Sequence, residues 1–223
     1  MATKSLLADL VQTYRLSTGI FVHIDSVGGV DAAKRVQSGE AFDLVLLASD
    51  AIDRLVVSGH LQSNSRQDWV CSPVAVAVRA GAPHPDLTDE AALKAAVLAS
   101  PTLSYSTGPS GVYLEQLFGR WGVAEALKSR LVVPPPGTPV ASLVASGQAA
   151  LGFQQLSELI RFSGIDVLGT LPDDVAFITT FSSGIPLAIA ADARQSMAVK
   201  AFLDYLASAV ADDLKRKHGM YWN

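Results

Sequence analysis

The sequence predicts an α/β fold divided into two lobes, and three observations support this prediction. Short apolar runs of strand length alternate along the chain with stretches whose apolar residues recur at helical spacing. Segment 80–85, AGAPHP, is the clearest break in composition and is typical of a crossing between domains. With 223 residues, of which 49% are hydrophobic, the chain is long enough for two cores. We therefore expect lobe I to contain residues 1–79 and 181–223, and lobe II to be inserted as residues 80–180.

Each expected helix of the first lobe is followed by a glycine that ends it. Glycine marks a helix end because it adopts the left-handed backbone conformation without steric cost. A continuous apolar run such as 43–47 is typical of a strand buried on both faces of a parallel sheet. The expected elements are, in order, a helix along 6–14 that stops at Gly19, a strand over 20–24, a helix ending at Gly39, a strand over 43–47, a helix capped by Ser49-Asp50 and closed by Gly59, and a strand over 70–78.

The second lobe shows the same alternation, which favours parallel sheets under right-handed crossovers. The prolines of 134–139 require an irregular segment, because proline fixes its own backbone and biases the preceding residue against helix. The elements expected from here to the end of the chain are helices over 89–99, 112–118, 140–144 and from 154–157, strands at 103–105, 131–133, 149–153, 165–168 and 175–180, a separating turn at 182–184, a strand at 186–189 and a helical tail over 199–206 with a basic end at 215–217.

Four strand-to-helix turns are rich in Gly, Ser or Pro, and they lie at 26–29, 106–111, 136–138 and 154–157. Ligands of open α/β sheets bind beyond the carboxyl ends of strands, so we expect these turns to converge on a cleft between the lobes. In the second turn a helix start offers backbone N–H groups without internal partners, and Ser110 adds a hydroxyl donor. The alternative is an ordinary N-cap, because serine is a favoured capping residue.

Six segments in collinear order resemble the molybdate-binding solute receptors of ABC importers. They are KSLLADL, AAKRVQSGEAFDLVLLASDAIDRLVVSGHL, YSTGPSGVYLEQLFGRWGVAEAL, ASLVASGQAALGFQQLSEL, KAFLDYLAS and KRKHGM. The resemblance implies a type II periplasmic-binding-protein fold, with two α/β lobes of parallel-rich sheets, helices on both faces and two interdomain crossings. It also implies hinge closure on a small anionic ligand and, for an exported protein, an importer permease as partner.

The resemblance places ligand-binding groups at matching positions of this chain. In lobe I it implies Ser5 and the backbone of Gly28 and Gly29, because the family's serine-rich turn is matched here by 27–30. In lobe II it implies the residues Ser110, Gly137 or Thr138, and Gln155, the last at the position of a ligand-facing tyrosine. Lys4, next to Ser5, either pairs with a ligand oxygen or is an ordinary solvated lysine.

The departures from the family pattern bear on the ligand, because they also allow one that is larger or less symmetric than molybdate, such as a small carboxylate. Replacing a serine by glycine and a tyrosine by glutamine removes two hydroxyl donors, adds an amide and makes room. We therefore expect a molybdate-like oxyanion or a small organic acid. The sequence as written begins four residues ahead of Ser5, where family members carry a signal peptide and a first strand, so it predicts a cytoplasmic protein, or a periplasmic one if the true start lies upstream.

An enzyme is the alternative function, because the aconitate isomerases look similar to solute receptors of this type. Such an isomerase of a small polycarboxylate needs a base and donors that stabilise an enolate-like charge, but no cofactor. The candidate groups are Lys4, Asp31, Tyr105 and Glu158. Asp31 is more typical of a first-turn helix acid and Glu158 of a surface residue, while Tyr105 is either a donor in the cleft or part of the core.

Several other classes of function are excluded. Net charge is −4 without a basic stripe, so we expect no nucleic-acid partner. Apolar runs fall far short of the roughly 20 residues that span a bilayer, so we expect no membrane insertion. The single cysteine, Cys71, excludes an internal disulfide, and His23, His60, His84 and His218 have no metal-ligand spacing. The sequence contains no P-loop, dinucleotide fingerprint or nucleophile elbow, so we expect no metal and no cofactor.

Overall fold

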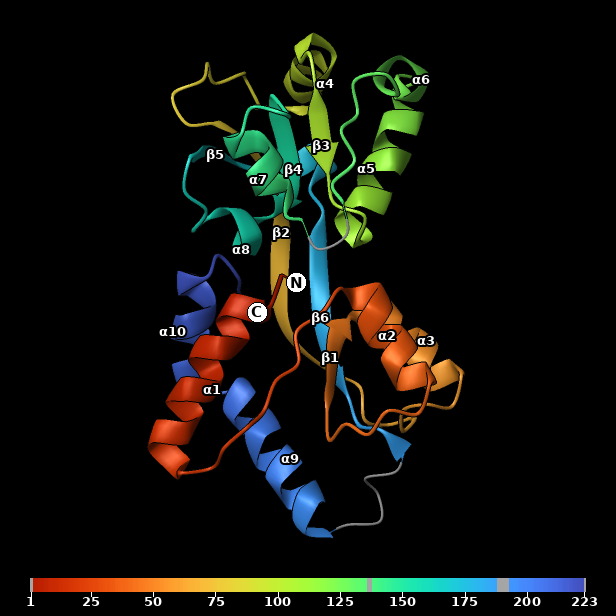
Figure 1. The fold of residues 1–223 in the computed structure, drawn as a ribbon, viewed down its shortest axis with the longest axis vertical. Helices are drawn as coiled ribbons and strands as arrows, with labels where there is room; N and C mark the ends of the chain where they lie inside the picture. Colours follow the sequence, from red (N-terminus) through yellow and green to blue (C-terminus); the bar gives the residue numbers. More distant parts are fainter. Residues whose placement is uncertain (1, 136–137, 188–192, 223) are drawn as a thin grey trace. The chain divides into compact units, whose positions relative to one another are not determined.

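The computed structural model describes residues 2–135, 138–187 and 193–222, and its chain divides into two compact units (Figure 1). Unit 1 contains residues 1–71 and 180–223, and unit 2 contains residues 72–179. The chain passes from one unit to the other within two strands, β2 (Gln67–Arg79) and β6 (Ile178–Gly184). The first boundary therefore lies inside a strand, after Cys71, rather than in the proline-rich segment after Arg79.

Unit 1 combines helices with a short antiparallel strand pair. Its elements are α1 (Lys4–Thr18), α2 (Gly29–Gln37), β1 (Val45–Ala48), α3 (Ser49–Val57), the first part of β2, the second part of β6, α9 (Ala193–Leu206) and α10 (Ala209–Lys217). β1 runs antiparallel to β6, with Val45 opposite Gly184 and Ala48 opposite Phe181. The predicted end of α1 is confirmed, since Gly19 has a φ of 72° and its N–H donates to the carbonyl of Arg15.

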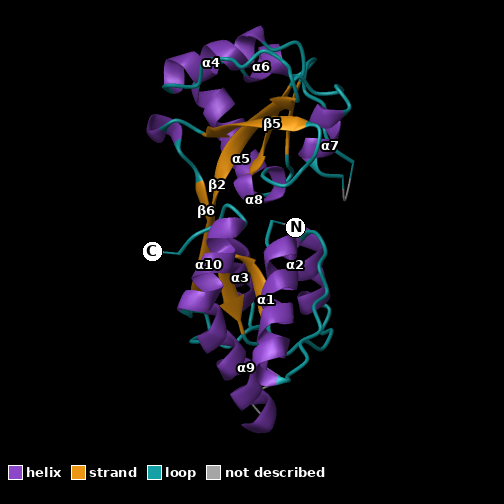
Figure 2. Cartoon of the chain, turned by 90° about the vertical axis from the view of Figure 1, so that its left-hand side faces the viewer, coloured by secondary structure: helices purple, strands orange, loops and turns teal. Residues whose placement is uncertain are grey.

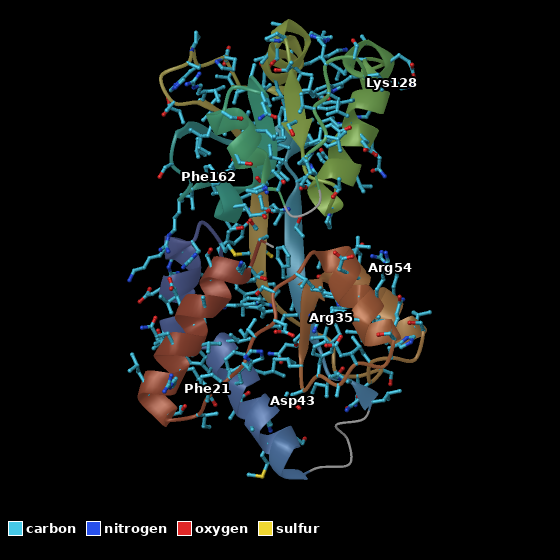
Figure 3. All side chains as sticks on the ribbon, in the orientation of Figure 1. Phe21, Arg35, Asp43, Arg54, Lys128 and Phe162 are labelled. Atoms are coloured by element: carbon cyan, nitrogen blue, oxygen red, sulfur yellow. The ribbon has the colours of Figure 1, made fainter. Side chains whose placement is uncertain are left out.

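The segment between α1 and α2 has no regular structure. The strand predicted over 20–24 is wrong, because these residues, all described, find no partner strand and leave Phe21 67% exposed. The segment is instead attached to α2 by Arg35, which is labelled with Phe21 in Figure 3. The Arg35 guanidinium donates to Asp25 (2.8 Å) and to Glu40 (2.7 Å), and these hydrogen bonds lower the pKa of both carboxyl groups.

Unit 2 is a mixed sheet covered by helices (Figure 2). Its elements are the second part of β2, α4 (Glu90–Ala99), β3 (Leu103–Tyr105), α5 (Pro109–Arg120), α6 (Ala124–Leu127), α7 (Val140–Ala145), β4 (Leu151–Gln155), α8 (Leu156–Leu159), β5 (Ile165–Thr170), the 3-10 turn η1 (Asp173–Val175) and the start of β6. β2 is antiparallel to β4 and to β5, and β3 is parallel to β4. β6 also lies beside β2, in the strand order β1–β6–β2–β4–β3.

The two faces of this sheet carry different cores. Because successive side chains of a strand point to opposite faces, Tyr105 and Phe153, which pair in register, share the face covered by α5. Phe118 of α5 contacts both rings, at centroid distances of 6.0 and 6.3 Å. The opposite face is covered by α7, whose Val144 packs so closely that a Cβ on Gly152 would lie 2.3 Å from its Cγ2 atom.

Three expectations about strands need correction. The sheet is mixed rather than parallel-rich, because β1 is antiparallel to β6 and β2 is antiparallel to β4 and β5, while β3 is parallel to β4. Residues 182–184 lie inside β6 instead of separating two strands. The predicted strand at 131–133 is reduced to one bridge between Leu131 and Leu103. Part of the strand expected at 186–189 lies outside the described residues.

Candidate functional site

The turn between β3 and α5 has the features predicted for a ligand-binding group. Gly108 is the N-cap of α5, no side chain caps the helix, and its first turn contains no acidic residue. Ser110 is 1% exposed, and its hydroxyl lies 2.8 Å from the Ser106 hydroxyl. The turn therefore presents two neighbouring hydroxyls beside the positive end of a twelve-residue helix dipole.

Gly111 allows the first turn of α5 to approach the preceding loop. A Cβ at this position would lie 1.6 Å from the carbonyl oxygen of Ser106, far inside any van der Waals contact. The N–H groups of Gly111 and Val112 both donate to the carbonyl of Gly108, at 2.9 and 3.1 Å. This close approach keeps the Ser106 and Ser110 hydroxyls adjacent, so the loop requires glycine here.

Gln155 lies at the end of the sheet where α5 begins, on the face that α5 covers. It is the last residue of β4 rather than part of the predicted helix, and it is 4% exposed. Since it lies two residues beyond Phe153, its side chain belongs to the face that α5 covers. Its Nε2 atom donates to the Thr179 hydroxyl at 2.6 Å, and its Oε1 atom has no hydrogen-bond partner among the described residues.

Parallel pairing of β3 and β4 explains why the start of α5 and the end of β4 lie at the same edge of the sheet. The strands share a direction, so their carboxyl ends lie at one edge of the sheet of unit 2, where α5 and α8 begin. Two buried serines, Ser72 and Ser157, also lie here, with their hydroxyls 3.3 Å apart. The structure thus places Ser110, at the start of α5, and Gln155, at the end of β4, toward the same edge of the sheet, although the sequence placed them in separate turns.

A third turn reaches this edge on the opposite face of the sheet. The N–H of Ala141, in the first turn of α7, donates to Oε1 of Gln154 at 3.3 Å. Thr138 precedes this helix, is half-buried, and donates its N–H to the carbonyl of Pro135. Gly137 lies outside the described residues. Thr138 is therefore held near the same edge as Gln155 but beside α7 rather than α5.

The candidate groups of unit 1 lie at two helix starts. Lys4 and Ser5 are exposed residues of the first turn of α1, whose N-cap, Thr3, makes no side-chain capping bond. Gly28 is the N-cap of α2 and Gly29 its first residue, so this turn offers only backbone N–H groups, as expected. Both helices begin at the same end of unit 1 (Figures 1 and 2).

A hydroxyl network in unit 1 was not predicted from the sequence. The predicted capping role of Ser49 is wrong, because the N-cap of α3 is Ala48. The Ser49 hydroxyl instead lies 2.9 Å from the Thr180 carbonyl and 2.7 Å from the Ser182 hydroxyl, which donates to Asp68. The sequence signal for this hydroxyl is a serine at the junction of a strand and a helix. The residues that it contacts, Thr180 and Ser182, lie more than 130 positions further along the chain.

The titratable side chains that the sequence singled out, Tyr105, Glu158 and Asp31, differ in burial and therefore in how they could transfer a proton. Burial, together with the nearby negative charge of Glu115, raises the pKa of Tyr105 to about 12, so its phenol stays protonated near neutral pH and does not act there as a phenolate base. Burial also raises the pKa of Glu158. Glu158 is half-buried rather than a surface residue, which brings it closer to the requirement for a general base. Asp31 is an exposed residue of the first turn of α2, as predicted.

Two classes of site find no support in the described part of the chain. No group of three or more His, Cys, Asp or Glu side chains there could hold a metal ion. No helix within the described ranges is long and apolar enough to cross a membrane. The groups described at the start of α5 and the end of β4 are neutral hydrogen-bonding groups, and Tyr105 and Glu158 are the titratable side chains with raised pKa values.

Comparison with known proteins gives the family. Residues 1–221 match the family described as bacterial extracellular solute-binding protein. The chain is 37% identical over 210 residues to an aconitate isomerase from a Pseudomonas species, a match that covers 91% of this chain and 78% of that protein. It is 21% identical over 218 residues to the molybdate-binding protein ModA of Escherichia coli, covering 96% of this chain and 83% of ModA.

Solved structures show the same fold. The periplasmic molybdate-binding protein of Azotobacter vinelandii superimposes with a TM-score of 0.78 at 20% identity, covering 99% of this chain and 96% of that one. The tungstate-binding protein TupA of Desulfovibrio alaskensis has a TM-score of 0.66 at 18% identity, covering 93% and 86%. The chain therefore has a type II periplasmic-binding-protein fold and belongs to the bacterial extracellular solute-binding protein family.

Proposed function

We propose that this protein binds a small anion, an oxyanion or a carboxylate, through neutral hydroxyl, amide and backbone N–H groups. The observation that carries the proposal is the start of α5, where the buried Ser110 and its neighbour Ser106 stand beside an uncapped helix N-terminus. Helix starts of this kind favour negative charge. Because the chain carries a net charge of −4, an anion needs such a local site.

Each unit offers its own proposed ligand-binding residues, argued from the surroundings within that unit. In unit 2, Ser110 and Gln155 share one end and one face of the sheet, and Thr138 lies near the same edge. In unit 1, the starts of α1 and α2 supply Ser5, Gly28 and Gly29, with Lys4 as a charge partner for a carboxylate oxygen. Gly137 completes the proposed set, on the family resemblance alone.

A small carboxylate suits these residues better than a symmetric tetraoxoanion. An amide at position 155 can donate at one end and accept at the other, so it fits a ligand with chemically different parts. The relative with the higher sequence identity is named for aconitate, a tricarboxylate, and the more distant one for molybdate. We therefore propose an organic acid as the ligand class.

A thermal-shift screen tests this proposal. The panel contains molybdate, tungstate, sulfate, phosphate, and di- and tricarboxylates, each added in large excess to the full chain. A ligand present at 100 times its dissociation constant adds about 2.7 kcal/mol to the free energy of unfolding, which is readily visible as a rise in Tm. A panel in which no anion raises Tm would contradict the proposal.

A second candidate function is a cofactor-independent isomerase of a small polycarboxylate. Two observations favour it, namely the 37% identity to an aconitate isomerase and the burial of Glu158, which raises the pKa of that carboxyl group. A base with a raised pKa is better matched to abstracting a proton near neutral pH. The hydroxyls at the start of α5 would then stabilise the enolate-like charge that develops.

The isomerase hypothesis is tested by turnover. The protein is incubated with cis- or trans-aconitate, without added cofactor, and the other isomer is followed by chromatography. Interconversion that is lost in Glu158→Gln would support the enzyme. Tight binding with no interconversion would favour a receptor, in line with the family's description as bacterial extracellular solute-binding protein. For such a receptor we propose an importer permease as the partner.

A further inference from the structure

The side-chain amide of Gln155 is paired at one end only. Its Nε2 atom donates to Thr179 at 2.6 Å, while its Oε1 atom is buried and has no partner within the described part of the chain. The residue as a whole is 4% exposed. A buried acceptor without a hydrogen bond destabilises the folded chain, so one at a binding site points to a partner supplied by the ligand.

We propose that Oε1 of Gln155 accepts a hydrogen bond from a hydroxyl of the ligand, so that the protein prefers hydroxycarboxylates over the corresponding acids without the hydroxyl. This inference rests on the proposed function, because it names the ligand class of that same site. An amide oxygen can only accept. It therefore cannot pair with a deprotonated carboxylate or with a fully deprotonated oxyanion such as molybdate.

The other groups of the site complement this acceptor. The Ser106 and Ser110 hydroxyls and the start of α5 can donate to the carboxylate oxygens, and α5 is the helix that covers the face of the sheet to which Gln155 belongs. A ligand with a hydroxyl beside a carboxylate offers both a donor and acceptors. Such a ligand satisfies the helix start and the amide oxygen together, whereas an acid without the hydroxyl leaves Oε1 unpaired.

The orientation of the amide decides the direction of the preference. With Nε2 toward Thr179, the free end accepts and selects a ligand hydroxyl. With the amide turned over, the free end would carry two N–H donors and would select ligands that offer only acceptors. The two orientations thus predict opposite preferences, and ligand pairs that differ by one hydroxyl distinguish them.

The test is calorimetric titration of the full chain with two matched pairs, malate against succinate and citrate against tricarballylate. We expect the hydroxy acid of the pair that fits the site to bind at least tenfold tighter than its partner. In Gln155→Met, which has a similar volume but no amide, this ratio should fall to within about twofold. The exposed Gln148→Met should leave it unchanged.

The possible results show whether the inferred hydroxyl preference fails alone or whether the proposed anion binding fails with it. Equal or tighter binding of the acids without the hydroxyl, or a hydroxyl preference that survives in Gln155→Met, would overturn the inference and leave the proposed function standing. Binding of molybdate or sulfate without any carboxylate would do the same. If no anion of either kind binds, the proposed function fails and the inference fails with it. The wild-type comparison remains decisive even if Gln155→Met does not fold.

Discussion

The Ser110 hydroxyl lies 2.8 Å from the Ser106 hydroxyl, at the point where β3 ends and α5 begins. Ser110 is 1% exposed, and Ser106 is half-buried. Neither hydroxyl caps the helix. The buried Ser110, its half-buried neighbour Ser106 and the helix start without a side-chain cap are the features of unit 2 on which the proposed function rests.

Replacing Ser110 by alanine should weaken anion binding by about 1–2 kcal/mol, the usual contribution of one such hydrogen bond. The measurement is calorimetric titration with the tightest anion of the screening panel. Ser58→Ala, at an exposed position after α3, serves as the control and should bind normally. Unchanged affinity in Ser110→Ala would remove this residue from the site.

Gly111→Ala and Gly119→Ala, both in α5, should change stability in opposite directions. A Cβ at Gly111 would lie 1.6 Å from the Ser106 carbonyl oxygen, whereas a Cβ at Gly119 meets no atom within 4 Å. Overpacking of a rigid site costs roughly 1–3 kcal/mol or more. Alanine in place of an unhindered helix glycine adds about 0.5–1 kcal/mol. Urea denaturation measures both, and equal effects of the two substitutions would contradict the close approach.

The raised pKa of Tyr105 predicts a loss of stability in alkali. The pKa is about 10 in the unfolded chain and about 12 in the folded one, mainly because burial disfavours the phenolate. The folded state therefore holds its proton more tightly, so this contribution to stability is fully present below pH 10 and is lost as the pH rises toward 12. The stability of the wild type should therefore fall relative to that of Tyr105→Phe over that range. Parallel curves would show that Tyr105 is not perturbed.

The buried Lys215 should depend on its ion pair with Asp212. The Lys215 side chain is fully buried, and its ammonium lies 2.9 Å from a carboxylate oxygen of Asp212, which is 34% exposed. Removing one partner of a fully buried pair costs about 3–5 kcal/mol, and the exposure of Asp212 makes a somewhat smaller loss the expected result for Asp212→Asn.

The neighbouring pair of Arg216 and Asp213 provides a matched control, because both side chains are largely exposed. Exposed ion pairs contribute at most about 1 kcal/mol. Chemical denaturation of Asp213→Asn should therefore give nearly the wild-type stability. Equal losses in Asp212→Asn and Asp213→Asn would mean that Lys215 does not require its partner.

Local sequence signals predicted most elements and the start of α5, because helix periodicity, terminal glycines and turn residues act over a few positions. Gly19 after α1 and the Thr107–Gly111 turn before α5 are examples. Strand pairing was harder to predict, since it depends on partners far along the chain. The antiparallel contact of β1 with β6 joins residues about 135 positions apart, and no local pattern specifies it.

Side-chain environments at the site were predicted in part. The residue types at 110 and 155 indicated neutral donors, but only the register of β3 with β4 places both on one face. The burial of Glu158 and the network from Ser49 to Asp68 depend on tertiary packing, so the sequence indicated neither. Mixed pairing also explains why the apolar run at 43–47 did not mean burial on both faces, since β1 alternates between buried and half-buried residues.

The most direct test of the account is NMR titration of the isotope-labelled chain with the tightest anion of the panel. The account predicts that the largest shifts in unit 2 fall on the backbone amides of 108–111 and on the side-chain amide of Gln155. Shifts that leave these groups unmoved while another part of unit 2 responds would contradict the assignment of the anion to the start of α5.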